Sequence, residues 1–344
     1  MRVDRDVPFT SLTTLRLGGP ASELLTAESV EDIAAVVHQH RRHGFLAIGG
    51  GSNLVVADDG VETPVLRIAT TGVEITTHDD RVDLLVAAGE GWDALVERSV
   101  QEGWSGIETL SGIPGLVGAT PIQNVGAYGQ ELSDVCTAVD VIDRKSRHQR
   151  TLSAADCRFG YRTSLFKSEP DRYVVTNVRL TLARTSQSGP IRYAELAQRL
   201  GVEIGERAPA RDVRENVLAL RRSKGMVLDP ADHDTWSAGS FFTNPVLAPS
   251  VELPAEAPQW PQQDGRIKTS AAWLIERAGF ERGFGDQVGR GVVTLSTKHT
   301  LALTNRGEGT TTELLELARL VRERVHGQFD IALEPEPTLI GCEL

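Results

Sequence analysis

The chain of 344 residues is long enough for two or three domains, and its 40% apolar and 24% charged residues are ordinary for a globular protein. Its formal net charge of −11 excludes nucleic acid and anionic lipid as main binding partners, because both require positive charge. No apolar run approaches the ~20 residues of a membrane span, and residues 1–12 lack the apolar core of a secretory signal. We therefore expect a cytoplasmic protein with no nucleic-acid partner and no membrane insertion. We also expect a monomer.

The distribution of cysteines argues against a metal site, and that of the glycines indicates a ligand bound by backbone groups. Cys136, Cys157 and Cys342 are scattered and lack the spacing of metal ligands, so we expect neither a structural disulfide nor a metal site. The 33 glycines are clustered in short runs. Such runs are typical of backbone that closely approaches a ligand.

The first half of the chain predicts alternating helices and strands. Its expected elements are, in order, a helix at 28–43, a strand at 45–48, a glycine loop at 49–53, a strand at 54–57, strands between 65 and 90, a helix at 92–102, an irregular stretch at 110–131, and strands at 135–142 and 173–182. Ser29 is expected to cap the first helix and Gly44 to end it.

The second half predicts a compact α+β domain. Its expected elements are a helix at 212–222 capped by Asp212, an irregular excursion at 245–264 with five prolines, a helix at 270–278, strands at 292–296 and 300–304, and a helix at 310–326. The last helix is the best specified, because Thr310 and Glu313 form a capping box and Gly327 is expected to end it.

Two glycine-rich loops carry the strongest functional signal. Gly49, Gly50 and Gly51 follow a strand, and backbone N–H groups in such a loop can cradle a diphosphate. The loop lacks both the GxGxxG of a Rossmann fold and the Gly-Lys-Ser/Thr of a P-loop, and a simple turn explains it equally well when it is taken alone. Together with the loop at 110–131, it predicts a large cofactor with a diphosphate and a flat ring, such as FAD. The expected cofactor-binding residues are Gly49, Gly50, Gly51, Ser52, Asn53, Ser111, Gly112, Ile113, Pro114, Gly118, Ala119, Thr120, Gln123, Asn124, Gly126, Ala127 and Tyr128.

Five motifs in order give the chain a resemblance that covers nearly its whole length. They are TLRLGG at 14–19, the stretch at 110–131, GYRTS at 160–164, AGSFFTNP at 238–245 and EPE at 334–336. The loop at 48–54 resembles that of FAD proteins of the vanillyl-alcohol-oxidase type. The set as a whole resembles the UDP-N-acetylenolpyruvoylglucosamine reductase (MurB) family.

The resemblance implies an α+β fold, with a PCMH-type two-part FAD-binding domain and a smaller α+β substrate-binding domain. The first FAD-binding part is expected at 1–65, joined by the tail at 331–344, the second at 66–212, and the substrate-binding domain at 213–330. The activity implied is NADPH-dependent reduction of UDP-N-acetylglucosamine enolpyruvate to UDP-N-acetylmuramate through non-covalent FAD, in peptidoglycan precursor synthesis. NADPH and substrate are expected to use one cleft in turn, since no second dinucleotide motif is present.

The same resemblance implies three catalytic residues. Ser240 would give a proton to the substrate carbon, although a lone serine is more often a turn residue or a cap. Arg162 would polarise the carboxylate of the developing enolate, although composition alone favours a surface arginine. Glu336 would be the partner acid, with Glu334 as a rival. Here the chain departs from the family, which usually continues with a small apolar residue and an arginine rather than Pro337 and Thr338.

Four further residues are implied for the UDP-sugar. Lys224 lies in a basic run that equally suits a helix C-terminus. Tyr193 resembles the lid tyrosine of the family branch with an extra loop, and a buried hydrogen-bonded tyrosine is the alternative. Asn244 and His299 complete the set, and His299 equally suits a surface position at the end of a strand.

Alternative functions remain open at this point. A flavin oxidase of the same fold, acting on an alcohol or sugar, often anchors FAD through His or Cys beside the diphosphate loop, and neither occurs between 44 and 77. A non-catalytic flavin sensor is a second alternative. A protein with no cofactor is the third, but two such loops would be costly in conformational entropy without a ligand to order them.

Overall fold

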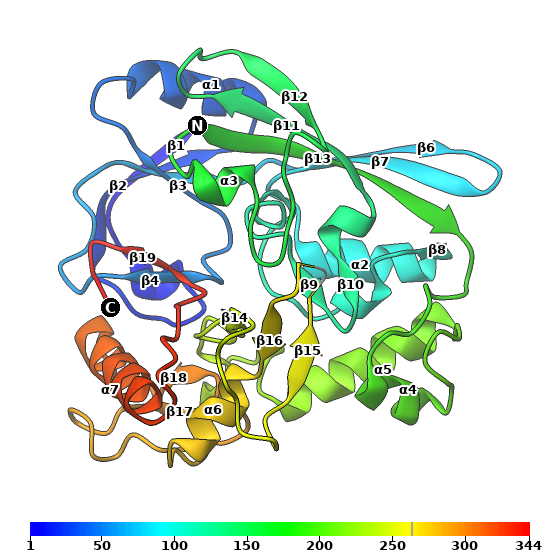
Figure 1. Ribbon diagram of the computed structural model, residues 1–344. Helices are drawn as coiled ribbons and strands as arrows, with labels where there is room; N and C mark the ends of the chain where they lie inside the picture. The colour runs from blue at the N-terminus through cyan, green and yellow to red at the C-terminus, as the bar shows by residue number, and fades with distance from the viewer. Residues whose placement is uncertain (263) are drawn as a thin grey trace. The chain divides into compact units, whose positions relative to one another are not determined.

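The computed structural model describes residues 1–262 and 264–344 (Figure 1). The chain forms two compact units, each built from several segments. Unit 1 consists of Met1–Asp6, Ser22–Gly50 and Glu62–Arg222, and unit 2 of Val7–Ala21, Gly51–Val61 and Ser223–Leu344. The expected excursion at 245–264 includes residue 263, which lies outside the described residues. No helix in the described part of the chain is long and apolar enough to cross a membrane.

Unit 1 holds most of a four-stranded sheet, a six-stranded sheet and five helices among its described residues. The four-stranded sheet has the order β1-β2-β5-β3, with β2–β5 and β5–β3 parallel. Its strands are β1 (Arg2–Pro8), β2 (Pro20–Ala27), β3 (Leu46–Ile48) and β5 (Val65–Ile68). The six-stranded sheet consists of β6 (Val73–Thr77), β7 (Arg81–Ala87), β8 (Trp104–Ser105), β11 (Cys136–Asp143), β12 (Gln149–Ser153) and β13 (Tyr173–Arg184). The helices are α1 (Val30–Gln39), α2 (Trp92–Gln101), α3 (Leu165–Ser168), α4 (Ala194–Leu200) and α5 (Ala210–Ser223).

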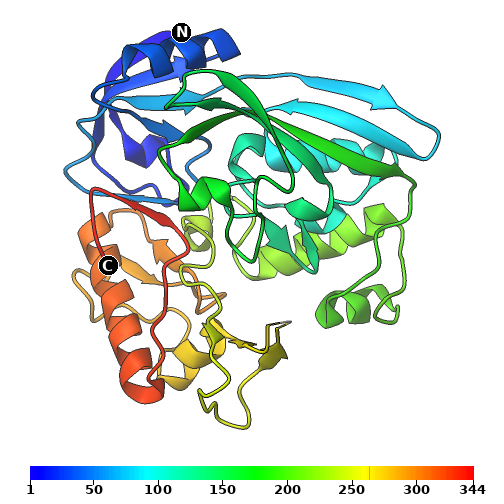
Figure 2. The ribbon, with the colours of Figure 1, turned by 45° about the horizontal axis from the view of Figure 1, so that its top comes forward.

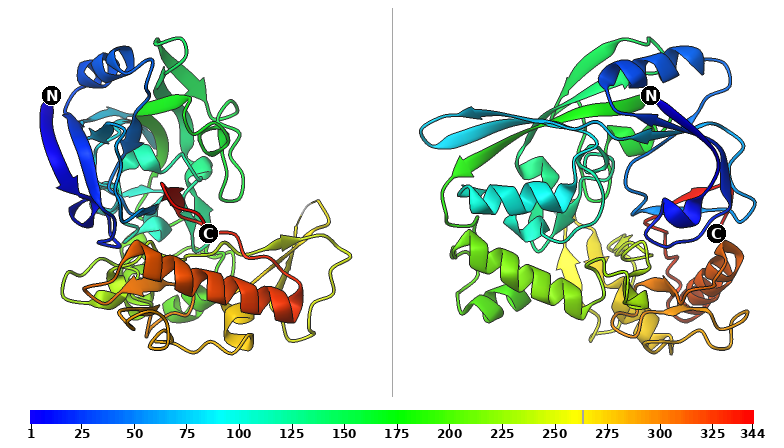
Figure 3. Two further views of the ribbon diagram at one scale, coloured as in Figure 1. Left: turned by 90° about the vertical axis from the view of Figure 1, so that its left-hand side faces the viewer. Right: turned by 180° about the vertical axis from the view of Figure 1, so that it is seen from behind.

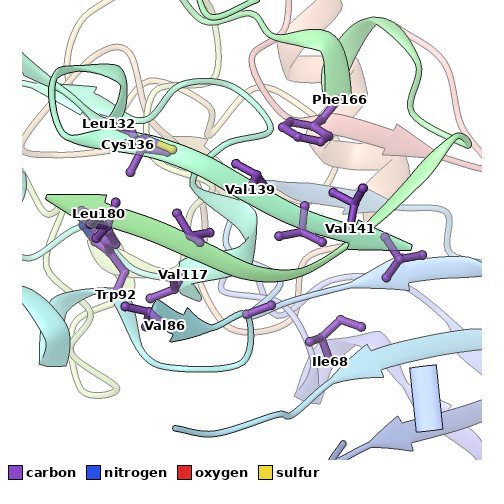
Figure 4. Packing of buried hydrophobic residues seen from close by; sticks show 14 of the residues in the cluster. Ile68, Val86, Trp92, Val117, Leu132, Cys136, Val139, Val141, Phe166 and Leu180 are labelled. Atoms are coloured by element: carbon purple, nitrogen blue, oxygen red, sulfur yellow. The ribbon is translucent and has the colours of Figure 1, made fainter. Parts of the chain in front are cut away.

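The six-stranded sheet organises the core of unit 1. Its order is β12-β11-β13-β7-β6, with β8 paired with the end of β13, and the β6–β7 hairpin extends beyond the other strands (Figure 2). Strand β13 alternates buried and less buried residues, so one face packs inward. Figure 4 shows Val86, Trp92, Val139 and Leu180 packed together there, all at most 1% exposed. This core fixes both ends of the loop at 110–131.

A smaller apolar cluster forms around α4 and α5. It includes Ile191, Leu196, Val213 and Val217, with Tyr128 packed against it. Helix α5 runs alongside α2 (Figure 3, right). The segment expected to carry the lid residue Tyr193 is therefore anchored by its own core.

The described residues of unit 2 form an α+β assembly of short strands and two helices. Its strands are β4 (Leu54–Val56), β14 (Val246–Leu247), β15 (Gln259–Pro261), β16 (Ile267–Thr269), β17 (Val293–Leu295), β18 (Leu303–Asn305) and β19 (Thr338–Ile340), and its helices are α6 (Ala271–Arg277) and α7 (Thr311–Phe329). Helix α7 contacts α6, β17 and β18. Strand β19 pairs in parallel with β4, which directly follows the first glycine loop.

Most predicted elements are confirmed, and the corrections concern helix ends and short strands. Helix α1 ends at Gln39, before Gly44. The stretch at 110–131 contains a short antiparallel pair of strands, β9 (Gly126–Ala127) and β10 (Gln130–Glu131), and β14 lies at the start of the expected excursion. Helix α5 begins at Ala210, so Asp212 lies in its first turn and is not its cap. Strand β15 forms at the end of the expected excursion and pairs with β16. Helix α7 has the predicted capping box but continues through Gly327 to Phe329, where Asp330 in the left-handed conformation ends it. One glycine inside a helix costs only about 1 kcal/mol, which packing of the helix readily offsets.

Candidate active site

The first glycine loop lies between β3 and β4. In unit 1, a Cβ added at Gly50 would lie 3.0 Å from the Cα of Gly115, so the two glycine loops touch backbone to backbone. In unit 2, Gly51 has a φ of +63°, and an added Cβ would lie 1.9 Å from the carbonyl oxygen of Leu12. Close-packed backbone without side chains is what a diphosphate-binding loop requires.

The second glycine loop is irregular but firmly anchored in unit 1. The buried side chain of Asn124 donates hydrogen bonds to Glu131 Oε2 at 2.8 Å and to the carbonyl of Gly160 at 3.3 Å. Its Oδ1 accepts from the backbone N–H of Ser133 at 2.9 Å. At Gly118 an added Cβ would lie 2.5 Å from the Cβ of Ala88. The loop is therefore ordered by contacts within the protein itself.

An acidic side chain on α2 orients the start of this loop. Asp93 Oδ1 accepts from the backbone N–H of Gly112 at 2.6 Å. The same carboxylate forms a bidentate pair with Arg214 of α5, at 2.6 and 3.1 Å. Burial raises the pKa of Asp93, but the bonds to Arg214 and Gly112 outweigh it, and the net pKa is lowered. Nothing in the sequence distinguishes Asp93, because an acidic residue in the first turn of a helix is already favoured by the helix dipole.

Arg162 occupies a tight turn next to the second loop. Its φ is +52°, and Gly160 and Thr163 on either side exchange two backbone hydrogen bonds. Its Nη2 donates to the carbonyl of Gly126 at 2.8 Å. Ser164 caps α3 and donates to the carbonyl of Ile122 at 2.6 Å, which ties the turn to the loop. Unit 1 thus brings Arg162 to the predicted cofactor residues.

Tyr193 also lies beside these residues. Its ring packs edge-on against Tyr128 at 5.2 Å, and its side chain is 41% exposed. The buried carboxylate of Glu108 accepts from the backbone N–H of Gly189 and from Gln130 Nε2, both at 2.8 Å. Glu108 therefore links the Tyr193 segment to the end of the loop at 110–131. No local pattern around Glu108 indicates this role.

The AGSFF motif forms a turn in unit 2 that presents Ser240. Gly239 has a φ of +74°, and Ser237 Oγ accepts from its backbone N–H at 3.2 Å. Phe241 and Phe242, at 1% and 0% exposure, anchor the far side of Ser240. The backbone N–H of Phe241 donates to the carbonyl of Leu301 at 2.8 Å. Two buried aromatic rings on one side and a glycine turn on the other fix this serine.

Glu336 lies on the strand segment that pairs with this turn. Its backbone N–H donates to the carbonyl of Phe241 at 2.9 Å, and Phe242 forms an antiparallel bridge with Pro335. The carbonyl of Glu336 accepts from Asn53 Nδ2 at 3.3 Å. Unit 2 therefore joins the first glycine loop, the Ser240 turn and the Glu336 segment.

In unit 2 the charge of Lys224 acts on the buried side chain of His299. Burial, and after it the charges of Lys224 and Arg282, together lower the pKa of His299 to about 4. His299 is therefore neutral at pH 7, able to hydrogen-bond without adding charge. Asn244 lies elsewhere in the same unit, where its Oδ1 accepts from the backbone N–H of Ala271, the first residue of α6, at 3.0 Å.

The predicted site residues divide between the two units. Unit 1 holds Gly49, Gly50, all the predicted residues from Ser111 to Tyr128, Arg162 and Tyr193. Unit 2 holds Gly51, Ser52, Asn53, Lys224, Ser240, Asn244, His299 and Glu336.

Comparisons with known proteins agree across the whole chain. Residues 229–340 match the family model described as UDP-N-acetylenolpyruvoylglucosamine reductase, C-terminal domain, and residues 21–152 match the FAD binding domain. A protein of Thermobifida fusca named UDP-N-acetylenolpyruvoylglucosamine reductase is 54% identical over 99% of this chain and 98% of its own length. A protein of Mycobacterium leprae with the same name is 48% identical over 98% of this chain and 95% of its own length.

A solved structure extends the likeness to the fold. The crystal structure of UDP-N-acetylenolpyruvylglucosamine reductase from Thermus caldophilus has a TM-score of 0.69 and 27% identity, and it covers 99% of both chains. The predicted α+β fold, FAD-binding domain and family are confirmed. The chain belongs to the UDP-N-acetylenolpyruvoylglucosamine reductase family of FAD-dependent oxidoreductases.

Proposed function

We propose that this chain reduces the enolpyruvyl ether of UDP-N-acetylglucosamine to UDP-N-acetylmuramate, with NADPH as the source of electrons. One observation supports this most directly. The hydrogen bonds from Asn53 to Glu336 and from Glu336 to Phe241 join the flavin loop, the acid and the serine turn within one unit. An oxidase of the same fold would have no evident use for the serine of this turn.

The reaction adds a hydride and a proton across one carbon–carbon double bond. The residues of the two glycine loops would hold FAD, which would supply the hydride chemistry that links NADPH to the terminal methylene of the enolpyruvyl group. Negative charge then develops on the carbon that bears the carboxylate. The hydroxyl of Ser240 gives its proton to that carbon, so that the two atoms added are the hydride and this proton.

The charge that develops in this step needs stabilisation. Arg162, a permanent cation, is suited to the enolate and carboxylate oxygens. Glu336, when protonated, stabilises the same charge by donating a hydrogen bond. These roles extend the family resemblance to this chain's own residues.

Binding of the UDP-sugar is assigned to four residues. Lys224 carries the positive charge suited to a diphosphate, and neutral His299 and Asn244 offer hydrogen bonds. Tyr193 is suited to close over the substrate, since it is exposed on a segment outside the main sheet. We place the FAD-binding parts at 1–65 with 331–344 and at 66–212, the substrate-binding domain at 213–330, and the protein in the cytoplasm as a monomer.

An anaerobic titration tests the proposal. NADPH is added to the FAD-loaded protein until the flavin absorbance bleaches, and UDP-N-acetylglucosamine enolpyruvate follows. Recovery of the oxidised spectrum without oxygen supports the reductase. Bleaching without recovery contradicts the substrate assignment, and recovery only on admitting air favours an oxidase. Failure to bind FAD contradicts the proposal as a whole.

A further inference from the structure

We propose that Thr14 is a positioning residue for Ser240, holding the serine turn and the first glycine loop in register through its hydroxyl and its backbone N–H. This inference rests on the proposed function of Ser240. Thr14 belongs to the TLRLGG motif at 14–19, to which the proposed chemistry assigns no role.

Thr14 bonds to both segments within unit 2. Its Oγ1 donates to the carbonyl of Ser237 at 2.7 Å, with a longer contact of 3.5 Å to the carbonyl of Ser52, and its backbone N–H donates to the carbonyl of Gly51 at 3.2 Å. Ser237 is 5% exposed, so its carbonyl has little access to water when Thr14 is changed. One residue thus joins two segments that lie 37 and 223 positions away in the sequence, counting from 14 to 51 and to 237.

The bond to Ser237 controls the orientation of the turn. Ser237 Oγ accepts from the N–H of Gly239, whose φ of +74° reverses the chain just before Ser240. An added Cβ at Gly239 would meet nothing within 4 Å, so packing does not hold this residue in place. The hydrogen bonds of Ser237 therefore hold the turn on this side.

The segment that carries Thr14 is braced independently of the hydroxyl. Arg16 has a φ of +53° and stacks over the Trp236 ring at 3.8 Å. Asn305, 1% exposed, donates from Nδ2 to the carbonyls of Leu15 and Arg16 at 3.1 and 3.3 Å, and its N–H donates to the carbonyl of Trp236 at 3.0 Å. These contacts persist when only the Thr14 hydroxyl is lost. The segment itself should therefore stay folded in such a variant.

The consequence for the reaction is specific. Proton transfer needs the donor oxygen within hydrogen-bonding reach of the carbon, and a displacement of 1 Å can cost about 100-fold in rate. Hydride transfer from NADPH does not use Ser240. Loss of the Thr14 hydroxyl should therefore slow reoxidation of the flavin by substrate and leave its reduction by NADPH unchanged.

Thr14→Val tests this, because valine keeps the branched shape and removes the hydroxyl. We expect reoxidation by the enolpyruvyl substrate to slow roughly 10- to 100-fold. The FAD dissociation constant, the visible spectrum and the rate of bleaching by NADPH should stay within about twofold of wild type. The solvent deuterium isotope effect on reoxidation should rise, as proton transfer becomes limiting.

Two further variants control for packing. Thr14→Ser retains the hydroxyl and should restore reoxidation to within about threefold of wild type. Thr13→Val removes a neighbouring hydroxyl that bonds only to Phe9 and Leu17 among the described residues, at 3.0 and 3.2 Å, and should leave both half-reactions unchanged.

The outcomes separate this inference from the proposed function. If wild type is reoxidised normally and Thr14→Val is too, the role of Thr14 is wrong and the function stands. If wild type is not reoxidised, the proposed function fails first. Equal slowing in Thr14→Ser would assign the effect to packing and overturn the inference. Loss of FAD in both Thr14→Val and Thr14→Ala would also overturn it, since Thr14 would then serve the cofactor loop alone.

Discussion

The side-chain amide of Asn53 donates a hydrogen bond of 3.3 Å to the main-chain carbonyl of Glu336, which lies 283 residues later in the sequence. The carbonyl of Asn53 accepts in turn from the N–H of Thr338 at 3.0 Å, and β4 and β19 continue this pairing. The C-terminal tail is therefore joined to the end of the predicted flavin loop. Pro337 and Thr338, where the chain departs from the usual family sequence, lie at the start of this pairing.

Asn53→Ala should loosen the tail around Glu336. The variant loses the bond to the Glu336 carbonyl and keeps the main-chain bond to Thr338, so we expect a loss of about 1 kcal/mol in stability. Amide exchange at Thr338 and Ile340 should quicken, as measured by hydrogen exchange with mass spectrometry. Asn216→Ala is the matched control, because its amide bonds to the carbonyl of Asp212 at 2.9 Å within α5. Equal exchange of the tail in both variants would contradict this role of Asn53.

Ser240→Ala should separate the two half-reactions. Removing the proposed proton donor should slow reoxidation by substrate about 100-fold or more, since general acid catalysis contributes roughly 10²–10⁴-fold. Bleaching by NADPH should be normal, because that step needs no proton from Ser240. Stopped-flow absorbance measures both rates. Exposed Ser250→Ala is the control, and normal turnover by Ser240→Ala would remove this serine from the mechanism.

Arg162→Lys should impair the same oxidative half-reaction. Lysine keeps the charge but replaces a planar fork by a point charge, and it loses the fixed orientation given by the bond to the Gly126 carbonyl. We expect a fall of about 10-fold or more in the reoxidation rate. Arg158→Lys is a close control, since Arg158 is exposed and also has a positive φ, +50°. Equal rates in the two variants would count against a role for Arg162.

The local signals in the sequence predicted the fold well where a few neighbouring residues decide the structure. The Thr310–Glu313 capping box and the Ser29 cap formed as expected, because each satisfies backbone donors one turn away. The predicted end of α7 was wrong. A glycine ends a helix only where the chain adopts the left-handed conformation, and here Asp330 rather than Gly327 does so.

The motifs identified the family but not the bonds that connect them. Nothing local in the sequence pairs Asn53 with Glu336 or Glu108 with Gly189, because such partners meet only after the chain has folded. The polar residue types gave the one available hint. A buried carboxylate or amide side chain near glycines requires hydrogen-bond partners, and backbone groups of the glycine loops are available as such partners. The spacing of these residues in the sequence does not show which loop each side chain bonds to.

The lowered pKa of His299 predicts that the protein loses stability as the solution becomes acidic. Its folded pKa of about 4, lowered first by burial and then by Lys224 and Arg282, lies below the unfolded value of 6.5. The unfolded chain therefore takes up a proton first, and stability falls as the pH drops from 6.5 to 4. Denaturant titrations across that range should show a slope that His299→Gln makes shallower, most clearly between about pH 5 and 6.5, above the range in which carboxylates titrate.

The causes of this shift can be tested separately. Lys224→Met should raise the pKa of His299, as followed by NMR of the ring proton. Lys298→Met is the control, because Lys298 neighbours His299 in sequence but its charge is paired with Asp232 at 2.5 Å. A His299 signal that moves equally in both variants would contradict the effect of the Lys224 charge on the pKa of His299.

The last prediction concerns Asp93 and its part in ordering the second glycine loop. Its carboxylate accepts from the N–H of Gly112 and pairs with Arg214, which is 11% exposed in its side chain. Asp93→Ala removes the acceptor and leaves Arg214 with only its longer ion pair to Glu97 at 3.9 Å, so we expect FAD affinity to fall about 10-fold or more. Asp93→Asn keeps an oxygen for Gly112 and should weaken FAD binding less.

The control for Asp93 is an ion pair of the same kind away from both loops. Asp140 accepts from Arg179 at 2.9 Å on the surface of the six-stranded sheet, and Asp140→Ala should leave the FAD dissociation constant unchanged. Flavin fluorescence measures that constant in all three variants. If Asp93→Asn binds FAD as weakly as Asp93→Ala, the charge on Arg214 is decisive rather than the bond to Gly112. If neither variant differs from wild type, the loop does not depend on Asp93, and its own contacts through Asn124 suffice to hold the backbone that faces the cofactor.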